Sequence, residues 1–303
     1  MIHPSVRRDH IASAVLAVPS IGVAALMGTV VVTLIARTDP IIFGQQGIYG
    51  LWEYLIAAPT RGGREGGIGP ILVATGWVLA IAVAACIPIG LPVAIGLAEW
   101  FRPGGTVASG GEGLAQGVSR ILGRVASLAL DVIAALPSIV VGMFGLMFFC
   151  EWLGMGWSVL AGGLTVATMV LPLFVRVAQG AIAAVPQDFR LAGAALGLPP
   201  GRVVLNIILP AAAPGIEAGL LLSTGRVLAE SAALMFTAGG SIRMPNEVSD
   251  PGRVLALHIF QLVMEVPGGE ARACASALVL VGVIAATGWA ARVLPARLAR
   301  VGA

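Results

Sequence analysis

The chain has 303 residues, of which 58% are hydrophobic and only 11% are charged. A soluble domain normally carries about 25% charged residues, so this composition excludes an ordinary soluble protein and indicates a polytopic membrane protein. The formal net charge of +3 is too small to indicate nucleic acid as a partner.

Six apolar stretches are long enough to cross a bilayer, which takes about 20 residues in a helix. They are roughly residues 11–36, 69–98, 125–150, 157–180, 213–237 and 271–293. The first stretch is too long for a signal peptide, so it is predicted to remain as a membrane helix. Pro88 and Pro92 predict a kink or break near the end of the second. The expected fold class is an all-α bundle of about six transmembrane helices.

The distribution of arginine predicts the orientation of these spans, because cytoplasmic segments of membrane proteins are enriched in basic residues. If the N-terminus is inside, the inner segments hold eleven arginines and the outer segments hold six. Acidic residues are more frequent in the outer segments. Both termini are therefore expected on the cytoplasmic side.

The inner loop at 184–212 has the pattern of two short helices joined by a turn. Pro186 suits the start of a helix over 187–196, and Gly197 fits its C-terminal cap. Pro199-Pro200 starts a second helix, which Leu209-Pro210 is expected to end. The apolar residues of this loop predict an exposed face that docks on a partner. Packing of the loop on its own transmembrane bundle is the alternative.

The fifth predicted span carries two charges, Arg226 and Glu230, which lie four residues apart on one face of a helix. Charged groups inside a membrane are costly, and a buried ion pair rarely offsets its own desolvation. The pair is therefore interpreted as functional, with an intrahelical pair that stabilises one bundle as the alternative. The three cysteines form no CxxC pair, which argues against a metal site. No nucleotide-binding signature occurs in the sequence.

The loop at 184–212 resembles the EAA loop of ABC importer permeases, which in that family forms a coupling helix in a groove of the cytoplasmic ATPase. Leu191 stands where Glu is usual in the pattern, and Gly193 stands where the second Ala is usual. The resemblance implies that the residues coupled to the ATPase are Phe189, Leu191, Ala192, Gly193, Ala195, Leu196, Gly197, Leu209 and Pro210.

Four further segments resemble the PstA family of phosphate permeases. They are GGIGPILVATGWVL at 66–79, IPIGLPVAIGLAEW at 87–100, ALPSIVVGMFGL at 135–146 and RVLAESAALMFTA at 226–238. The segments occur in the family's order, and the match extends to about Thr287. Positions that depart from the family pattern in the last segment are Ala229, Ser231 and Ala233.

This resemblance implies a permease subunit of an ATP-driven importer for inorganic phosphate, which forms half of the translocation path and has no ATPase site of its own. The expected partners are a second permease of similar fold (PstC-like), two cytoplasmic ATPase subunits (PstB-like), which use ATP and Mg, an external phosphate-binding protein (PstS-like) and membrane lipid. The expected location is the inner membrane of a bacterial cell. The expected organisation is an N-terminal helix with an external loop over 1–65, a permease domain over 66–293 and a cytoplasmic tail over 294–303.

The substrate path is expected to include Arg226, whose fork of donors suits a tetrahedral oxyanion. Glu230 is expected to hold Arg226 and weaken its grip on the anion, because transport requires release. Ser231 and Thr237 are expected to add hydroxyl donors. No cofactor is expected on this chain. The alternatives are a permease for molybdate, phosphonate or another oxyanion, an ATP-independent secondary carrier, and a membrane scaffold that transports nothing.

Overall fold

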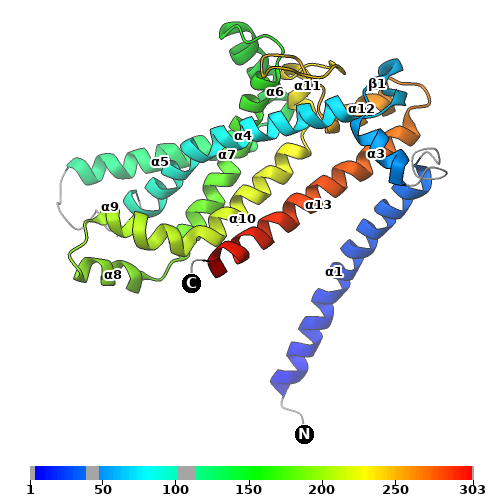
Figure 1. The fold of residues 1–303 in the computed structure, drawn as a ribbon. Helices are drawn as coiled ribbons and strands as arrows, with labels where there is room; N and C mark the ends of the chain where they lie inside the picture. Colours follow the sequence, from blue (N-terminus) through cyan, green and yellow to red (C-terminus); the bar gives the residue numbers. More distant parts are fainter. Residues whose placement is uncertain (1–3, 39–47, 102–113, 302–303) are drawn as a thin grey trace.

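The computed structural model describes residues 4–38, 48–101 and 114–301, and most of these residues are helical (Figure 1). Five helical segments are long and apolar enough to cross a membrane, and a bent pair of helices makes a sixth candidate span. The single-helix spans are Pro19–Arg37, Gly69–Trp100, Val159–Ala184, Pro200–Leu228 and Glu270–Trp289. The predicted all-α class and the predicted number of spans are confirmed.

The first helix, α1 (Pro4–Arg37), stands at the edge of the bundle (Figure 1). None of its apolar span is buried within the chain, and its main contact is with α13 (Glu270–Val301). α13 in turn packs on α10 (Leu209–Leu228) and on α12 (Leu255–Met264). The helix of α13 continues through the segment predicted as a tail, as far as Val301.

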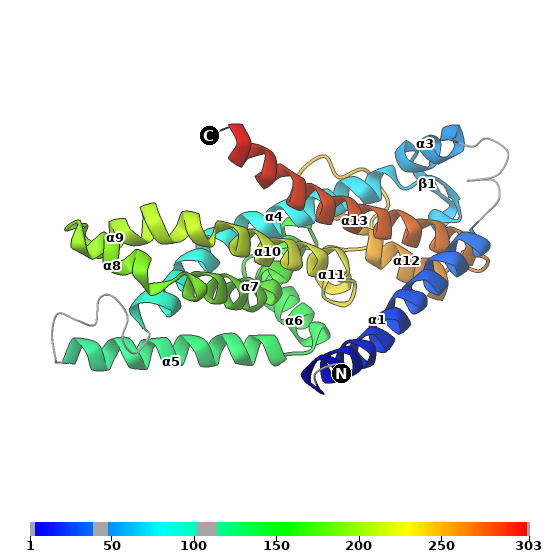
Figure 2. The ribbon, with the colours of Figure 1, turned by 90° about the horizontal axis from the view of Figure 1, so that it is seen from below.

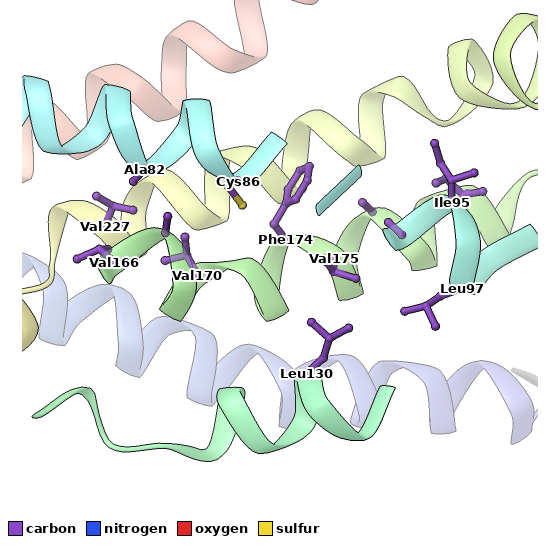
Figure 3. Close-up of a cluster of buried hydrophobic side chains, with 14 of the residues drawn as sticks. Ala82, Cys86, Ile95, Leu97, Leu130, Val166, Val170, Phe174, Val175 and Val227 are labelled. Atoms are coloured by element: carbon purple, nitrogen blue, oxygen red, sulfur yellow. The ribbon is translucent and has the colours of Figure 1, made fainter. Parts of the chain in front are cut away.

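The centre of the bundle is α7 (Val159–Ala184), whose most extensive contacts are with α4 (Gly69–Ile95) and α10. α5 (Leu114–Ala135) runs along another side of α7, as the view from below shows (Figure 2). Phe174 of α7 is fully buried in the core that these helices share, near Cys86 and Val170 (Figure 3). This close packing makes α7 the central helix of the bundle, against which α4, α5 and α10 pack.

The second span does not break at its prolines. α4 continues through Pro88 and Pro92, and the irregularity comes just afterwards, in a π-helical turn over Gly96–Trp100 (η2). In this turn the backbone N–H of Phe101 donates to the carbonyl of Gly96, five residues back. A single π-turn of this kind shifts the register of the side chains that follow, and such turns are frequent at functional positions.

The third span is bent, whereas the sequence predicted one helix over 125–150. The part described as α5 ends at Ala135, α6 (Ser138–Gly145) starts after Pro137, and the two helices meet at 104°. A proline disfavours helical geometry at the residue before it and lacks the N–H that the helix would need, which accounts for the corner. A π-helical segment, η4 (Leu146–Trp152), extends α6.

The two ends of the bundle differ in structure (Figure 1). One end carries α3 (Ile48–Ile56), α12 and a short antiparallel pair of strands, β1 (Pro59–Thr60) and β2 (Glu65–Gly66), which are joined by a 3-10 turn over Arg61–Gly63 (η1). The opposite end carries the knuckle of α8 (Gln187–Ala195) and α9 (Pro200–Val203), together with the C-terminal end of α13. The arginine count predicts that the second end is cytoplasmic.

Candidate functional site

The fifth span is interrupted at the two charges that the sequence singled out. The prediction of one helix over 213–237 is wrong, because α10 ends at Leu228 and α11 (Ala232–Thr237) starts after a gap of three residues. In that gap the Oε1 atom of Glu230 accepts a hydrogen bond from the backbone N–H of Ala233 at 3.2 Å. The carboxylate thereby binds an N–H at the start of α11, in the way that capping side chains do.

Arg226 therefore lies just before a helix break and Glu230 lies within it, so the two are not on one continuous helix. Arg226 is in the last turn of α10, where the negative end of the helix dipole favours a cation. The Nη2 atom of Arg226 lies 3.8 Å from Oε2 of Glu230, too far for a hydrogen bond. The arginine side chain is 54% exposed and the glutamate side chain only 6%. Glu230 is thus fixed, while the Arg226 guanidinium has surface available for a ligand.

The two hydroxyl residues of the predicted path differ in accessibility. Ser231, in the gap itself, is half-buried beside Glu230. Thr237 is completely buried, and its hydroxyl donates to the carbonyl of Ala233 at 3.0 Å. A hydroxyl has one proton to donate, so Thr237 has no donor left for a substrate. Its place in the path stays a prediction that its burial does not support.

The knuckle has the predicted shape at its first helix and turn. α8 spans Gln187–Ala195, and Gly197 follows with a positive φ of 71°. The N–H of Leu198 donates to the carbonyl of Gly193, and the N–H of Gly197 donates to that of Ala194. These two bonds form the Schellman motif that glycine makes possible at a helix end.

One side of α8 is exposed and apolar. The exposed fractions are 45% for Phe189, 60% for Leu191 and 77% for Leu196. Ala192 and Ala195 of the predicted coupling set are exposed as well. The opposite side buries Arg190 and Gly193, which lie three residues apart on the helix. α8 therefore rests on the chain by one face and offers the other to a partner.

Gly193 departs from the family pattern for a steric reason. A Cβ atom at this position would lie 2.7 Å from Cγ2 and 3.0 Å from Cγ1 of Val203 in α9. Real Cβ atoms do not come that close, so an alanine here requires Val203 or the helix to move. In this chain the glycine lets α8 and α9 pack in direct contact.

Leu209 and Pro210 do not end the second helix of the knuckle, which corrects the prediction. The helical segment runs without a break from Pro200 to Leu228. It accommodates Pro210 by way of a π-turn over Val204–Ile208 (η5), just ahead of the proline. A proline cannot donate to the carbonyl four residues before it, and a local change in hydrogen-bond spacing is a common way to absorb that loss. The second helix of the knuckle and the fifth span are thus one continuous helical segment.

Sequence reasoning missed a buried ion pair behind α8. Nη2 of Arg190 lies 2.5 Å from Oε1 of Glu99, and the two side chains are only 8% and 1% exposed. Glu99 belongs to η2, at the end of the second span. The two residues are 91 positions apart in the sequence, so no local pattern links them. The only signals in the sequence are a lone glutamate at the end of an apolar span and an arginine inside an apolar knuckle.

A second ion pair joins α5 to α7. Nη2 of Arg176 lies 2.5 Å from Oδ1 of Asp131, and both side chains are partly exposed. Asp131 also lines a cavity of about 540 Å³, together with Arg120, Arg124 and Gln179. Within the described ranges, no three His, Cys, Asp or Glu side chains come together in a way that would hold a metal ion.

Known proteins resemble this chain in sequence and in fold. Residues 109–300 match the family described as binding-protein-dependent transport system inner membrane component. A probable ABC transporter permease protein, YqgI of Bacillus subtilis (strain 168), is 32% identical over 231 residues, which cover 71% of this chain and 73% of that protein. The phosphate transport system permease protein PstA 1 of Mycobacterium tuberculosis (strain H37Rv) is 29% identical over 248 residues, which cover 81% of this chain and 75% of that protein.

The fold comparison agrees with the sequence comparison. A chain of the MetNI methionine ABC transporter, solved in an inward-facing conformation, matches with a TM-score of 0.58 and 18% identity, over 75% of this chain and 95% of that chain. The resemblance to PstA-type permeases that the sequence motifs indicated is confirmed by relatives of that name. The chain is a multi-pass transport subunit, and it belongs to the family of inner membrane components of binding-protein-dependent transport systems.

Proposed function

We propose that this chain is the permease subunit of an ATP-driven importer of inorganic phosphate and forms half of the translocation path. The observation that carries the proposal is Arg226, a half-exposed guanidinium at a break in a membrane span. A phosphate ion must shed water to cross the membrane, and a guanidinium offers it several charge-assisted donors. The relatives named as phosphate permeases support this choice of substrate.

The neighbouring Glu230 gives the site a way to release its ligand. A lone arginine in a membrane would hold an anion too tightly for transport, since conduction requires that binding be reversible. Glu230 is held by Ala233 at a distance of 3.8 Å from the guanidinium, where its charge lowers the net attraction for an anion. Ser231 lies beside it and supplies a hydroxyl donor.

The exposed apolar face of α8 is the proposed docking surface for a cytoplasmic ATPase. Its residues are Phe189, Leu191, Ala192, Ala195 and Leu196. Leu191 in place of the family's glutamate makes this contact apolar and leaves no carboxylate at that position. The complete complex would contain a second, PstC-like permease, two PstB-like ATPases that use ATP and Mg, and an external PstS-like phosphate-binding protein. Closure of the ATPases would move the knuckle and switch the path between outward and inward access.

Family membership favours an importer over the ATP-independent carrier and the inert scaffold. A different oxyanion remains the second candidate, because the relative from Bacillus subtilis has a name that specifies no substrate. Arginine chemistry does not distinguish phosphate from molybdate or phosphonate, since each presents the same kind of oxygen acceptors.

The test is uptake into proteoliposomes that hold the chain together with its partner permease, its ATPase and its binding protein. Radiolabelled phosphate uptake is measured with ATP or with a non-hydrolysable analogue inside, and with unlabelled molybdate or phosphonate as competitor outside. The proposal expects ATP-dependent phosphate uptake that requires the binding protein and resists both competitors. Uptake of another oxyanion in place of phosphate would reassign the substrate, and uptake without ATP would contradict the importer.

A further inference from the structure

Arg190 bonds to two other parts of the chain at the end of the bundle where the knuckle lies. Its Nη2 and Nε atoms donate to the carboxylate of Glu99. The shortest of these bonds, from Nη2 to Oε1, is 2.5 Å long. Nη2 also donates to the carbonyl of Ile182 at 3.0 Å, and Nη1 donates to that of Val185 at 2.6 Å. One side chain of α8 thus holds the end of the second span and the end of α7 together.

The carbonyls that Arg190 binds lie at the C-terminal end of α7, and that of Ile182 also accepts a bond from the N–H of Val185 at 3.3 Å. The last carbonyls of a helix need donors from elsewhere, and a cation is favoured there by the helix dipole. Glu99 lies in the π-turn η2, whose altered register follows directly on the second span. The ion pair therefore joins two helix ends, that of α7 through the carbonyls and that of the second span through Glu99.

This ion pair connects α8 to the end of the second span. The larger backbone contacts of α8 are with α9 and η5, which follow it directly in the sequence. Glu99, by contrast, is 91 positions away from Arg190. A buried ion pair adds little stability compared with apolar residues of the same size, so its use here points to positional specificity.

We infer that Arg190 is a positioning residue that fixes α8 to the ends of α4 and α7, so that displacement of α8 moves both spans as one body. The inference rests on the proposed docking of α8 to an ATPase. Without the link, a push on α8 would reach the fifth span through the continuous segment from Pro200, while the second span would lag behind. The outcome would be ATP hydrolysis with little transport.

The test replaces the pair with apolar residues of similar volume, Glu99→Leu together with Arg190→Met, in the complete transport complex. This variant removes both buried charges together, so it is expected to fold and assemble. ATP hydrolysis should persist, while the number of substrate ions imported per ATP hydrolysed should fall by about fivefold or more. A ratio within experimental error of the wild-type value would show that the pair only fills space, and would overturn the inference.

A cross-linking control separates failure of this inference from failure of the proposed function. In a background without Cys86, Cys150 and Cys274, a Leu196→Cys substitution is cross-linked to the ATPase subunit. The inference expects the same cross-link with and without the double substitution. Loss of the cross-link in the double variant alone would mean that the pair shapes the docking surface, which contradicts it. Absence of the cross-link even with the native pair would refute the proposed docking instead.

A second measurement needs no change to the ion pair, so it decides the matter even if the double variant fails to assemble. Spin labels are placed at two exposed positions, Asp188 in α8 and Trp100 at the end of η2. The inference expects the distance between the labels to be the same in the nucleotide-free and ATP-bound complexes. A clear change in that distance between the two states would show that α8 moves independently of the second span.

Discussion

Two of the Arg–Glu pairs in the described part of the chain, Arg190–Glu99 and Arg226–Glu230, use the same chemistry in opposite ways. Arg190 and Glu99 are both buried and in direct contact, and they join segments that are far apart in the sequence. Arg226 and Glu230 are neighbours in sequence, yet they lie 3.8 Å apart, and the arginine is half exposed. The guanidinium of Arg190 donates its hydrogen bonds to groups of the chain itself. The guanidinium of Arg226 is half exposed and makes no hydrogen bond to Glu230, so it is available to an anion. An arginine whose donors are all bound within the chain is suited to positioning its neighbours. An arginine with free donors is a candidate site for a ligand.

The largest effect is expected from breaking the buried pair on one side. Glu99→Leu alone leaves the buried Arg190 guanidinium without its carboxylate and should lower the stability of the chain by about 3–5 kcal/mol. The double substitution should cost much less, because both charges are removed together. Thermal denaturation of the detergent-solubilised chain, followed by loss of its monodisperse peak, measures the difference. Equal losses for the single and double variants would contradict the assignment of this pair as mutually dependent.

The buried imidazole of His258 shows what burial does to a titratable group that has no charged partner of opposite sign within the ranges that the structure describes. His258 in α12 is 1% exposed, and its Nδ1 atom has no hydrogen-bond partner among the described residues. Burial, together with the nearby Arg253, lowers the pKa of His258 from 6.5 to about 4.

The unfolded chain therefore binds this proton at a higher pH than the folded chain does. The contribution of a neutral His258 to stability is complete above pH 6.5 and is lost as the pH falls toward 4, by about 3 kcal/mol in total. The difference between wild type and His258→Gln, measured by thermal denaturation from pH 7.5 to 4, isolates this term. A difference that does not change with pH would contradict a buried neutral imidazole.

The position of α8 depends on packing as well as on the ion pair, and Gly193 tests that part. Gly193→Ala places a methyl group 2.7 Å from Val203 and should cost about 1–3 kcal/mol through overpacking. Val203→Ala removes the obstructing methyl groups, so the double variant should recover part of the loss. Thermal denaturation of the four proteins gives the interaction energy between the two sites. Additive effects would mean that α8 and α9 do not pack as described.

The smallest effect on stability is expected from breaking the Arg226–Glu230 pair. A double-mutant cycle with Arg226→Gln and Glu230→Gln should give an interaction energy of about 1 kcal/mol or less, since the pair is partly solvated and makes no direct hydrogen bond. Glutamine keeps the carbonyl oxygen that accepts from Ala233, so the cap on α11 is preserved. An interaction energy as large as that of the buried pair would remove the contrast between them.

The sequence predicted the spans and the first helix of the knuckle because hydrophobic length, proline and glycine are local signals. Gly197, for example, predicts the end of α8 by its residue type alone, and its positive φ confirms that prediction. The sequence did not predict the break at Ala229–Ser231, because those residues are compatible with a helix and the competing hydrogen bond comes from the Glu230 side chain.

Other errors arose from how helices accommodate proline. Pro137 turns the third span by 104°, whereas Pro88, Pro92 and Pro210 are accommodated within continuous segments. In the fifth span, the π-turn η5 lies just ahead of Pro210 and accommodates the change in hydrogen-bond spacing. The Arg190–Glu99 contact was unpredictable for another reason, since it depends on the tertiary arrangement of helices that are distant in the sequence.

The most direct test of the account is phosphate uptake by the complete complex with Arg226→Gln. The matched control is Arg37→Gln, which removes the same charge from an exposed site on the peripheral helix α1. With assembly and ATP hydrolysis intact, the account predicts that Arg226→Gln lowers ATP-dependent uptake by about tenfold or more, because charge-assisted hydrogen bonds to the anion are lost. Arg37→Gln should transport normally. Uptake by the Arg226→Gln complex that equals that of the control would contradict the assignment of Arg226 to the substrate path.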